Sequence, residues 1–158
     1  MRKINSIFYS VFVLITIFSC EKENDAAEGE NEINIKFEAS NSLNINNPKL
    51  TIAVYGYDVF LADATATLIT RQDFQISSIP SSLTIKFPID SYKLIIPESK
   101  KENSRYYLAI DWDSDNNGKR CAGDITFDYD KKFPDVDLES TITQNYFMKL
   151  IPSTSPCN

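Results

Sequence analysis

The apolar residues of this chain alternate with polar ones at a period of two. Residues 33–38 read Ile-Asn-Ile-Lys-Phe-Glu, and residues 50–54 continue the pattern after a turn signal at Asn46-Asn47-Pro48. This period is typical of strands with one buried face, and it constrains the fold more than any other feature. Similar runs span residues 65–75, 83–89, 92–96, 105–112, 124–130 and 144–151. Eight short strands separated by turns predict an all-β sandwich.

No segment carries an amphipathic helical pattern over twelve or more residues, so we expect little helix. The alternation assigns one face of each of two strands to the core, and these faces carry Tyr106, Leu108, Ile110 and Trp112, and Ile125, Phe127 and Tyr129. Other aromatic residues could belong to the core or to a surface platform, and the pattern favours the core for Tyr55, Tyr57, Phe60 and Tyr92.

The amino terminus predicts export and lipid attachment. Arg2 and Lys3 precede an apolar run over residues 4–18, which has the length of a signal peptide core and is short for a membrane span. The run ends at Ile17-Phe18-Ser19-Cys20, which resembles the bacterial lipobox. There a small residue precedes the cysteine whose thiol takes up the lipid. Residues 1–19 are therefore predicted to be a signal peptide and Cys20 the lipidated residue; the alternative is a plain secretory signal with a chance cysteine.

Residues 20–32 are predicted to form a flexible tether, because they are rich in Glu, Asn, Asp and Gly and hold little apolar surface. Their acidic opening resembles tags that send lipoproteins to the outer face of some outer membranes. We expect an outer-membrane protein that faces the cell surface; the periplasmic face is the alternative. The remaining residues, 33–158, fit one domain.

Charge and cysteine content narrow the partners. Without Arg2 and Lys3 the mature chain holds 14 basic and 22 acidic residues, a net charge of −8 that disfavours nucleic acid. With Cys20 lipidated, Cys121 and Cys157 remain, and in an oxidising compartment they are predicted to form a disulfide; two free thiols are the alternative. Histidine is absent, which excludes a Ser-His-Asp triad and the common zinc sites.

Residues 111–124 read Asp-Trp-Asp-Ser-Asp-Asn-Asn-Gly-Lys-Arg-Cys-Ala-Gly-Asp. Counted from Asp113, the spacing is that of an EF-hand-type calcium loop. The third, fifth, seventh and twelfth positions are Asp115, Asn117, Lys119 and Asp124, with Gly118 sixth. A coiled loop aims alternate side chains at one centre, the sixth-position glycine permits the sharp turn, and the seventh residue supplies its carbonyl. Such hard oxygen ligands suit Ca²⁺, so we expect a structural calcium ion.

Three positions depart from the usual loop, and strands replace its flanking helices. Position eight is Arg120, position nine is Cys121, and the twelfth-position Asp124 is shorter than the usual Glu. The alternative is a charged hairpin loop with Asn-Gly at its turn. Close packing of Asp111 with the aspartates at positions one, three and twelve would be repulsive without a cation, which favours the ion.

A longer pattern resembles the YbaY/YscW family, which takes its name from a type III secretion lipoprotein chaperone. The matching residues lie between about 50 and 112 and comprise residues 57–67, Ile79-Pro80, Phe87-Pro88-Ile89-Asp90, Ile96-Pro97 and Tyr106-Tyr107-Leu108. The resemblance implies a single immunoglobulin-like sandwich of about seven or eight strands, tethered to the outer membrane. It implies no reaction. The aspartate loop lies outside the family pattern.

We therefore expect a non-catalytic binding or assembly lipoprotein, stabilised by calcium, that contacts an envelope protein or an extracellular ligand. A second hypothesis is a small glycan-active hydrolase that uses paired carboxylates such as Asp58 and Asp63. A third is a purely structural envelope lipoprotein.

Overall fold

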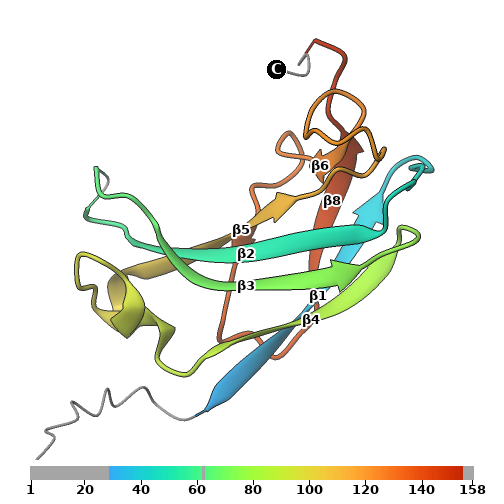
Figure 1. The fold of residues 1–158 in the computed structure, drawn as a ribbon. Coiled ribbons are helices and arrows are strands. Elements are labelled where there is room, and N and C mark those ends of the chain that lie inside the picture. The colour runs from blue at the N-terminus through green and yellow to red at the C-terminus, as the bar shows by residue number, and fades with distance from the viewer. Residues whose placement is uncertain (1–28, 62, 155–158) are drawn as a thin grey trace, which may run out of the picture.

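The computed structural model describes residues 29–61 and 63–154, which form a β-sandwich of two four-stranded sheets (Figure 1). The prediction of an all-β fold is confirmed. The strands are β1 (Glu30–Ala39), β2 (Lys49–Asp58), β3 (Thr67–Gln75), β4 (Ser81–Pro88), β5 (Ser104–Asp111), β6 (Ile125–Phe127), β7 (Asp135–Val136) and β8 (Gln144–Leu150). Two short 3-10 helices, η1 (Ser91–Leu94) and η2 (Lys101–Asn103), connect β4 to β5.

The strand order gives the sandwich an immunoglobulin-like centre. One sheet has the order β4-β1-β8-β6 and the other β3-β2-β5-β7. The antiparallel pairs β1–β4 and β2–β5 correspond to the B–E and C–F pairs of an immunoglobulin domain, with β3 and β7 flanking the second pair. The carboxy-terminal strand β8 runs parallel to β1 and occupies the place beside it that strand A takes in immunoglobulin domains.

The core lies between the two sheets and is filled by alternate residues of their strands. Trp112, Tyr146, Phe37 and Phe127 are its largest fully buried side chains. Trp112 follows β5 directly, and its indole N–H donates to the carbonyl of Asn47 at 2.8 Å, so its only polar atom is paired. The predicted core face of residues 106–112 is confirmed, since Leu108, Ile110 and Trp112 are buried and Tyr106 packs against the core.

The structure corrects several sequence-based predictions. Strand β1 begins at Glu30, so residues 30–32, predicted to belong to the tether, pair with β4. The predicted strand over 92–96 is wrong: Asp90 adopts a left-handed conformation (φ 56°), and η1 follows it in place of a strand. The two-residue strand β7 was missed. Tyr129, predicted to lie in the core, is 51% exposed. No helix among residues 29–61 and 63–154 is long and apolar enough to cross a membrane.

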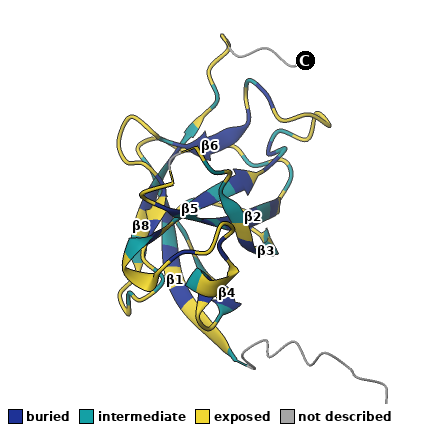
Figure 2. Cartoon of the chain, turned by 90° about the vertical axis from the view of Figure 1, so that its left-hand side faces the viewer, coloured by how far each residue is buried: buried dark blue, intermediate teal, exposed yellow. Residues whose placement is uncertain are grey.

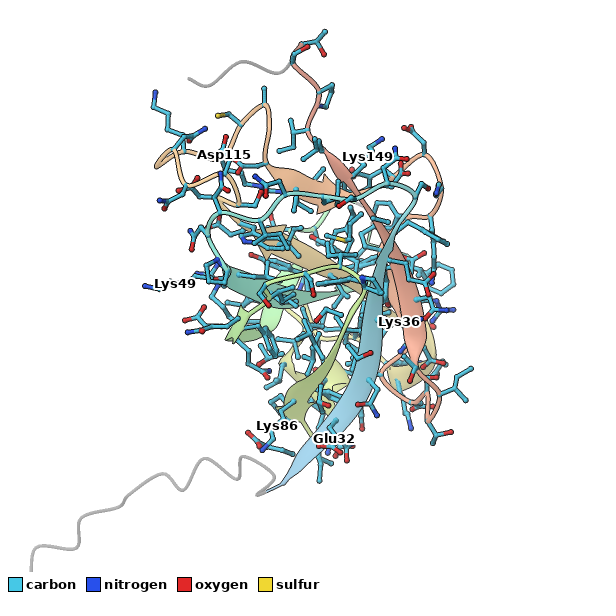
Figure 3. The ribbon with its side chains drawn as sticks, turned by 90° about the vertical axis from the view of Figure 1, so that its right-hand side faces the viewer. Glu32, Lys36, Lys49, Lys86, Asp115 and Lys149 are labelled. Atoms are coloured by element: carbon cyan, nitrogen blue, oxygen red, sulfur yellow. The ribbon has the colours of Figure 1, made fainter. Side chains whose placement is uncertain are left out.

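The strands give the sandwich two distinct ends. β1, β3, β5 and β8 begin at one end, where β2 and β4 finish; we call this the tether end, because the described chain enters there at Gly29. The aspartate loop follows the finish of β5 at the opposite end. Figure 3 shows this separation, with Asp115 near one end and Glu32 and Lys86 near the other.

Candidate functional site

The aspartate loop, residues 113–124, connects β5 to β6 and is fixed at its base by Ser114. The Ser114 side chain is fully buried, and its hydroxyl accepts from the backbone N–H of Ile125 at 2.8 Å. Its carbonyl accepts from the backbone N–H groups of Asn46 and Asn47, in the β1–β2 connection, at 2.8 and 3.0 Å. Sequence reasoning missed this residue, because its role depends on a segment far away along the chain.

Three of the predicted ligands come together in this loop. Carboxylate oxygens of Asp113, Asp115 and Asp124 all lie within 4.8 Å of one another. The Asp113 carboxylate accepts from the backbone N–H groups of Asn117 and Gly118, each at 2.9 Å, and Asp115 accepts from the same Asn117 N–H at 3.0 Å. These bonds coil residues 113–118 tightly. The first and third positions of the predicted loop therefore face one centre.

Asp124 is a fully buried carboxylate at the twelfth position. It accepts from the backbone N–H of Cys121 at 2.8 Å, from the N–H of Asp115 at 3.2 Å, and from the Ser114 hydroxyl at 3.3 Å. Such bonds compensate for the loss of water around a buried charge. Asp124 thus links the two halves of the loop.

Two glycines allow the loop to close. Gly118, at the sixth position, has φ 83°, and Gly123 has φ 101°, both in the region that disfavours side chains. A Cβ on Gly123 would also lie 3.1 Å from a carboxylate oxygen of Asp115. The backbone N–H of Gly123 donates to the carbonyl of Ile151 at 3.1 Å, and the N–H of Ile151 donates back to the carbonyl of Asp124 at 2.7 Å. The segment after β8 is therefore held beside the loop.

The other predicted site residues do not belong to the group of three close carboxylates. Asn117 and Lys119 are exposed, and the Asn117 side-chain oxygen accepts from the N–H of Lys119 at 2.8 Å. Asp111 is exposed at the end of β5 and is not one of the three mutually close carboxylates. Cys121 is buried. Cys157 and Cys20 lie outside the described residues, so the disulfide and the lipid attachment stay predictions.

The carboxylates of the loop retain coordination capacity. A carboxylate offers about four lone-pair positions, and the Asp113 and Asp115 side chains each accept two hydrogen bonds. No lysine or arginine of the described residues lies within 4.0 Å of the Asp113, Asp115 or Asp124 carboxylates. At an effective dielectric constant of about 20, two unit charges no more than 4.8 Å apart repel by at least about 3.5 kcal/mol. A hard cation among them would remove that cost.

A second candidate surface is a connected set of aromatic rings that extends from the outer face of the β3-β2-β5-β7 sheet onto the connection between β6 and β7. We call it the aromatic face, and it comprises Tyr55, Tyr57, Tyr107, Tyr129 and Phe133. The stacked rings of Tyr55 and Tyr107, on neighbouring strands, have centroids 5.5 Å apart. Phe133 lies 6.2 Å from Tyr107 and 6.1 Å from Tyr129, and the side chains of Phe133 and Tyr129 are about half exposed, at 52% and 51%.

This placement contradicts the core assignment made from the sequence. Tyr55 and Tyr57 point outward from β2, where Ile52, Val54 and their neighbours fill the inner face. Tyr92 is only partly buried and Phe60 is 78% exposed. Strand alternation finds the two faces of β2, but both faces carry apolar residues, so the pattern could not tell which one is buried.

Two hollows accompany these surfaces. A small one of about 260 Å³ borders the aromatic face beside Tyr55, with Arg71, Asp111 and Arg120 around a floor that includes Ala53. A larger one of about 1000 Å³ lies at the tether end. Its lining mixes aromatic, acidic and basic side chains, and two of them, Lys101 and Glu139, form an ion pair at 2.6 Å.

Asp58, proposed above as a catalytic carboxylate, is occupied by hydrogen bonds. One oxygen accepts from the backbone N–H of Phe60 at 2.8 Å and the other from the hydroxyl of Ser99 at 2.7 Å. The bond from the Phe60 N–H, followed by the one from Ser99, lowers the pKa of Asp58 below its usual value. Asp63 is exposed on the loop that follows. This bonding matches a carboxylate that holds the β2–β3 loop in place.

Comparison with known proteins gives little further information. No protein family model and no curated protein matches the chain. Among solved structures, the chain is similar to one described as "Structure of an alternative pilotin from the type II secretion system of Vibrio cholerae". The two are 22% identical, the match covers 78% of this chain and 96% of that one, and the TM-score is 0.43. A likeness this distant carries no conclusion about partner or activity, and the resemblance to the YbaY/YscW family stays a prediction.

Proposed function

We propose that this chain is an exported, lipid-anchored outer-membrane protein that acts as a non-catalytic binding module through its aromatic face. The observation that supports this function best is the set of connected, partly exposed rings that extends from the outer face of one sheet onto the β6–β7 connection. Tyrosine and phenylalanine supply large contact areas with little conformational freedom to lose, and such residues dominate many binding surfaces. Contiguous apolar groups on a surface commonly mark an interaction site.

Several features favour binding over catalysis. The chain has no histidine, which excludes the common nucleophile–base pairs, and Asp58 uses both of its oxygens as structural acceptors. The small hollow beside Tyr55 adds charged groups of both signs next to the rings. A ligand that covers the rings would also meet hydrogen-bonding groups there. The ligand is therefore an envelope protein or an extracellular molecule with both apolar and polar groups.

The test is capture of a ligand from detergent-solubilised envelope on the immobilised mature chain, with bound protein and bound carbohydrate both analysed. The informative variant replaces Tyr129 and Phe133 by serine, since both side chains are half exposed. The Tyr129 ring also contacts the buried Phe127 ring, so a thermal melt checks that the variant stays folded. Phe60→Ser is the matched control, because it removes an exposed phenylalanine elsewhere. We expect one ligand that the wild-type chain and the control retain and the double variant loses. Equal retention by all three chains, or no ligand at all, would contradict the proposal.

We further propose that Ca²⁺ binds the aspartate loop and stabilises it. Asp113, Asp115 and Asp124 would supply carboxylate oxygens, as their mutual distances of no more than 4.8 Å permit. The Asn117 side chain would join them by rotating its amide, because its nitrogen now lies 2.9 Å from a carboxylate oxygen of Asp115. The Lys119 carbonyl would complete the set at the seventh position. The ion's role is structural, and it takes part in no reaction.

Calcium titration calorimetry on the mature chain tests the ion. Extracellular calcium modules bind with dissociation constants of about 0.1–1 mM, so about 10 mM Ca²⁺ should stabilise the fold by about 1.4–2.7 kcal/mol. Asp113→Asn and Asp115→Asn should abolish the binding heat. Asp111→Asn is the matched control, since Asp111 makes no part of the close group, and it should keep the heat. Absence of heat with the wild-type chain would rule the ion out.

A further inference from the structure

Apolar side chains are exposed mainly at the tether end of the sandwich. Of the eleven large hydrophobic side chains that are exposed in residues 29–61 and 63–154, seven lie on the connections at this end. We call them the tether-end patch: Val59, Phe60, Leu61, Ile89, Leu94, Ile96 and Ile142. Phe60, Ile96 and Ile142 are 78%, 73% and 74% exposed. Side chains this exposed make no contribution to the core.

Specific bonds hold the segments of the patch in place, so its exposure is a property of the folded domain. The N–H of Val59 donates to the carbonyl of Asn103 at 3.1 Å, which ties the β2–β3 loop to η2. The N–H of Ile96 donates to the hydroxyl of Thr67 at 2.8 Å, which ties the segment after η1 to the start of β3. Figure 2 shows that exposed residues predominate in the connections at this end.

The described chain also enters the sandwich here. The carbonyl of Gly29 accepts from the N–H of Ile89, a member of the patch, at 3.2 Å. Cys20 lies nine residues earlier in the sequence, and nine residues span at most about 32 Å when fully extended. A lipid on Cys20 would therefore keep Gly29, and with it the tether end of the sandwich, no more than about 32 Å from the anchored residue.

The charges at this end favour an apolar contact with lipid that carries no net charge. Lys93 pairs with Asp90 at 2.7 Å and Lys101 pairs with Glu139 at 2.6 Å, so these side chains largely neutralise each other. The chain as a whole is acidic and would be repelled by anionic lipid. Zwitterionic lipid surfaces present no such repulsion.

We propose that the tether-end patch docks onto the bilayer that holds the lipid anchor, with Phe60 and Ile96 entering the interfacial region. This inference rests on the anchor of the proposed function. An anchor and an apolar contact together hold a protein on a membrane more firmly than either does alone. Docking would point the aspartate loop away from the membrane, because that loop lies at the other end, and would leave the aromatic face open at the side.

The test places a fluorescent probe in the patch. The native acylated chain carrying Phe60→Trp is reconstituted into phosphatidylcholine vesicles with plain or brominated acyl chains, which quench nearby tryptophan. Trp112 is only 1% exposed inside the core, so the wild-type chain supplies the background signal. We expect emission from the introduced indole to be quenched in the brominated vesicles and to stay quenched in high salt. Equal emission in both kinds of vesicle overturns the proposal.

Variants separate this docking from ligand binding. Without the anchor, vesicle binding of a chain that begins at Glu21 should fall about tenfold on Phe60→Ser, and similarly on Ile96→Ser, whereas Phe133→Ser should leave it unchanged. The capture experiment gives the opposite ranking, so either proposal can fail alone. A detergent-solubilised dimer that Phe60→Ser dissociates would assign the patch to a second copy and overturn docking. If mass analysis finds no lipid, the anchor fails, and quenching of the introduced indole on vesicle addition still decides whether the patch binds lipid.

Discussion

Single polar residues at the tether end fix the connections that surround the core. Asp58 is the clearest example, since its carboxylate accepts hydrogen bonds from the Phe60 N–H and the Ser99 hydroxyl. The Ser99 hydroxyl oxygen in turn lies 3.0 Å from that of Ser104. No buried side-chain polar atom of the described residues lacks a partner. The polar groups of the β2–β3 and β4–β5 connections therefore stabilise each other.

The lowered pKa of Asp58 predicts a pH dependence of stability. Its bonds favour the charged form, so their contribution is full above the unfolded-state pKa of about 3.9 and is lost as the pH falls through the lower folded-state value. Asp58→Asn removes this ionisation. Thermal melts from about pH 7 to about pH 2.5 should show the variant less stable at neutral pH and the difference shrinking below about pH 4. A difference that is constant over this range would count against the assignment.

Tyr146 predicts a measurable loss on removal of one hydroxyl. Its ring is buried, and the hydroxyl donates to the carbonyl of Asp135 in β7 at 2.8 Å. Burial, together with the nearby Asp135 charge, raises the pKa of this hydroxyl, so it stays protonated as a donor. Tyr146→Phe should lower the free energy of unfolding by about 1–2 kcal/mol in urea titration. Tyr129→Phe, at an exposed ring, should change it by less than about 0.5 kcal/mol.

At the scale of elements, strand alternation predicted most of the sandwich because one face of each long strand is buried. Alternation gave the wrong structure where contacts between distant segments determine whether a strand forms. Residues 92–96 are apolar enough for a strand, yet Asp90 turns the chain into η1, and Ile95 packs against Gly56. Strand β7 has two residues, too few for a period to be visible.

In the aspartate loop, too, the sequence predicted the features that are local along the chain and missed those that depend on distant segments. Spacing along the sequence identified Asp113, Asp115 and Asp124 because the ligand pattern is local. It did not identify Ser114, whose bonds reach the β1–β2 connection. Asp111, which was added because of its negative charge, is not one of the three mutually close carboxylates. Contacts between distant segments have no signature in the spacing of one loop.

Cys121 of the aspartate loop is predicted to form a disulfide with Cys157. Backbone bonds hold Ile151 beside Gly123 and Asp124, and Cys157 follows six residues later, within reach of the buried Cys121. A disulfide that closes the segment between Cys121 and Cys157 should stabilise the domain by up to about 3–4 kcal/mol. Thiol titration of the denatured, unreduced chain should find no free thiol at these positions, and Cys157→Ser should lower the melting temperature by several degrees. Two titratable thiols would show that the bond is absent.

For the whole molecule, we propose that the two ends and one side of the sandwich have different tasks. The tether end faces the bilayer, the aspartate loop stiffens the distal end, and the aromatic face is left open for a ligand. This arrangement requires that the chain be held by its amino terminus. The lipid on Cys20 is therefore the claim on which this orientation depends.

The most direct test is the intact mass of the chain extracted from the membranes of its own cells. We predict that residues 1–19 are absent and that the chain begins at Cys20 with covalently attached acyl groups. The Cys20→Ala variant should keep its unprocessed mass. A wild-type chain that retains residue 1, or that begins elsewhere without lipid, would contradict the lipid anchor and the membrane orientation that depends on it.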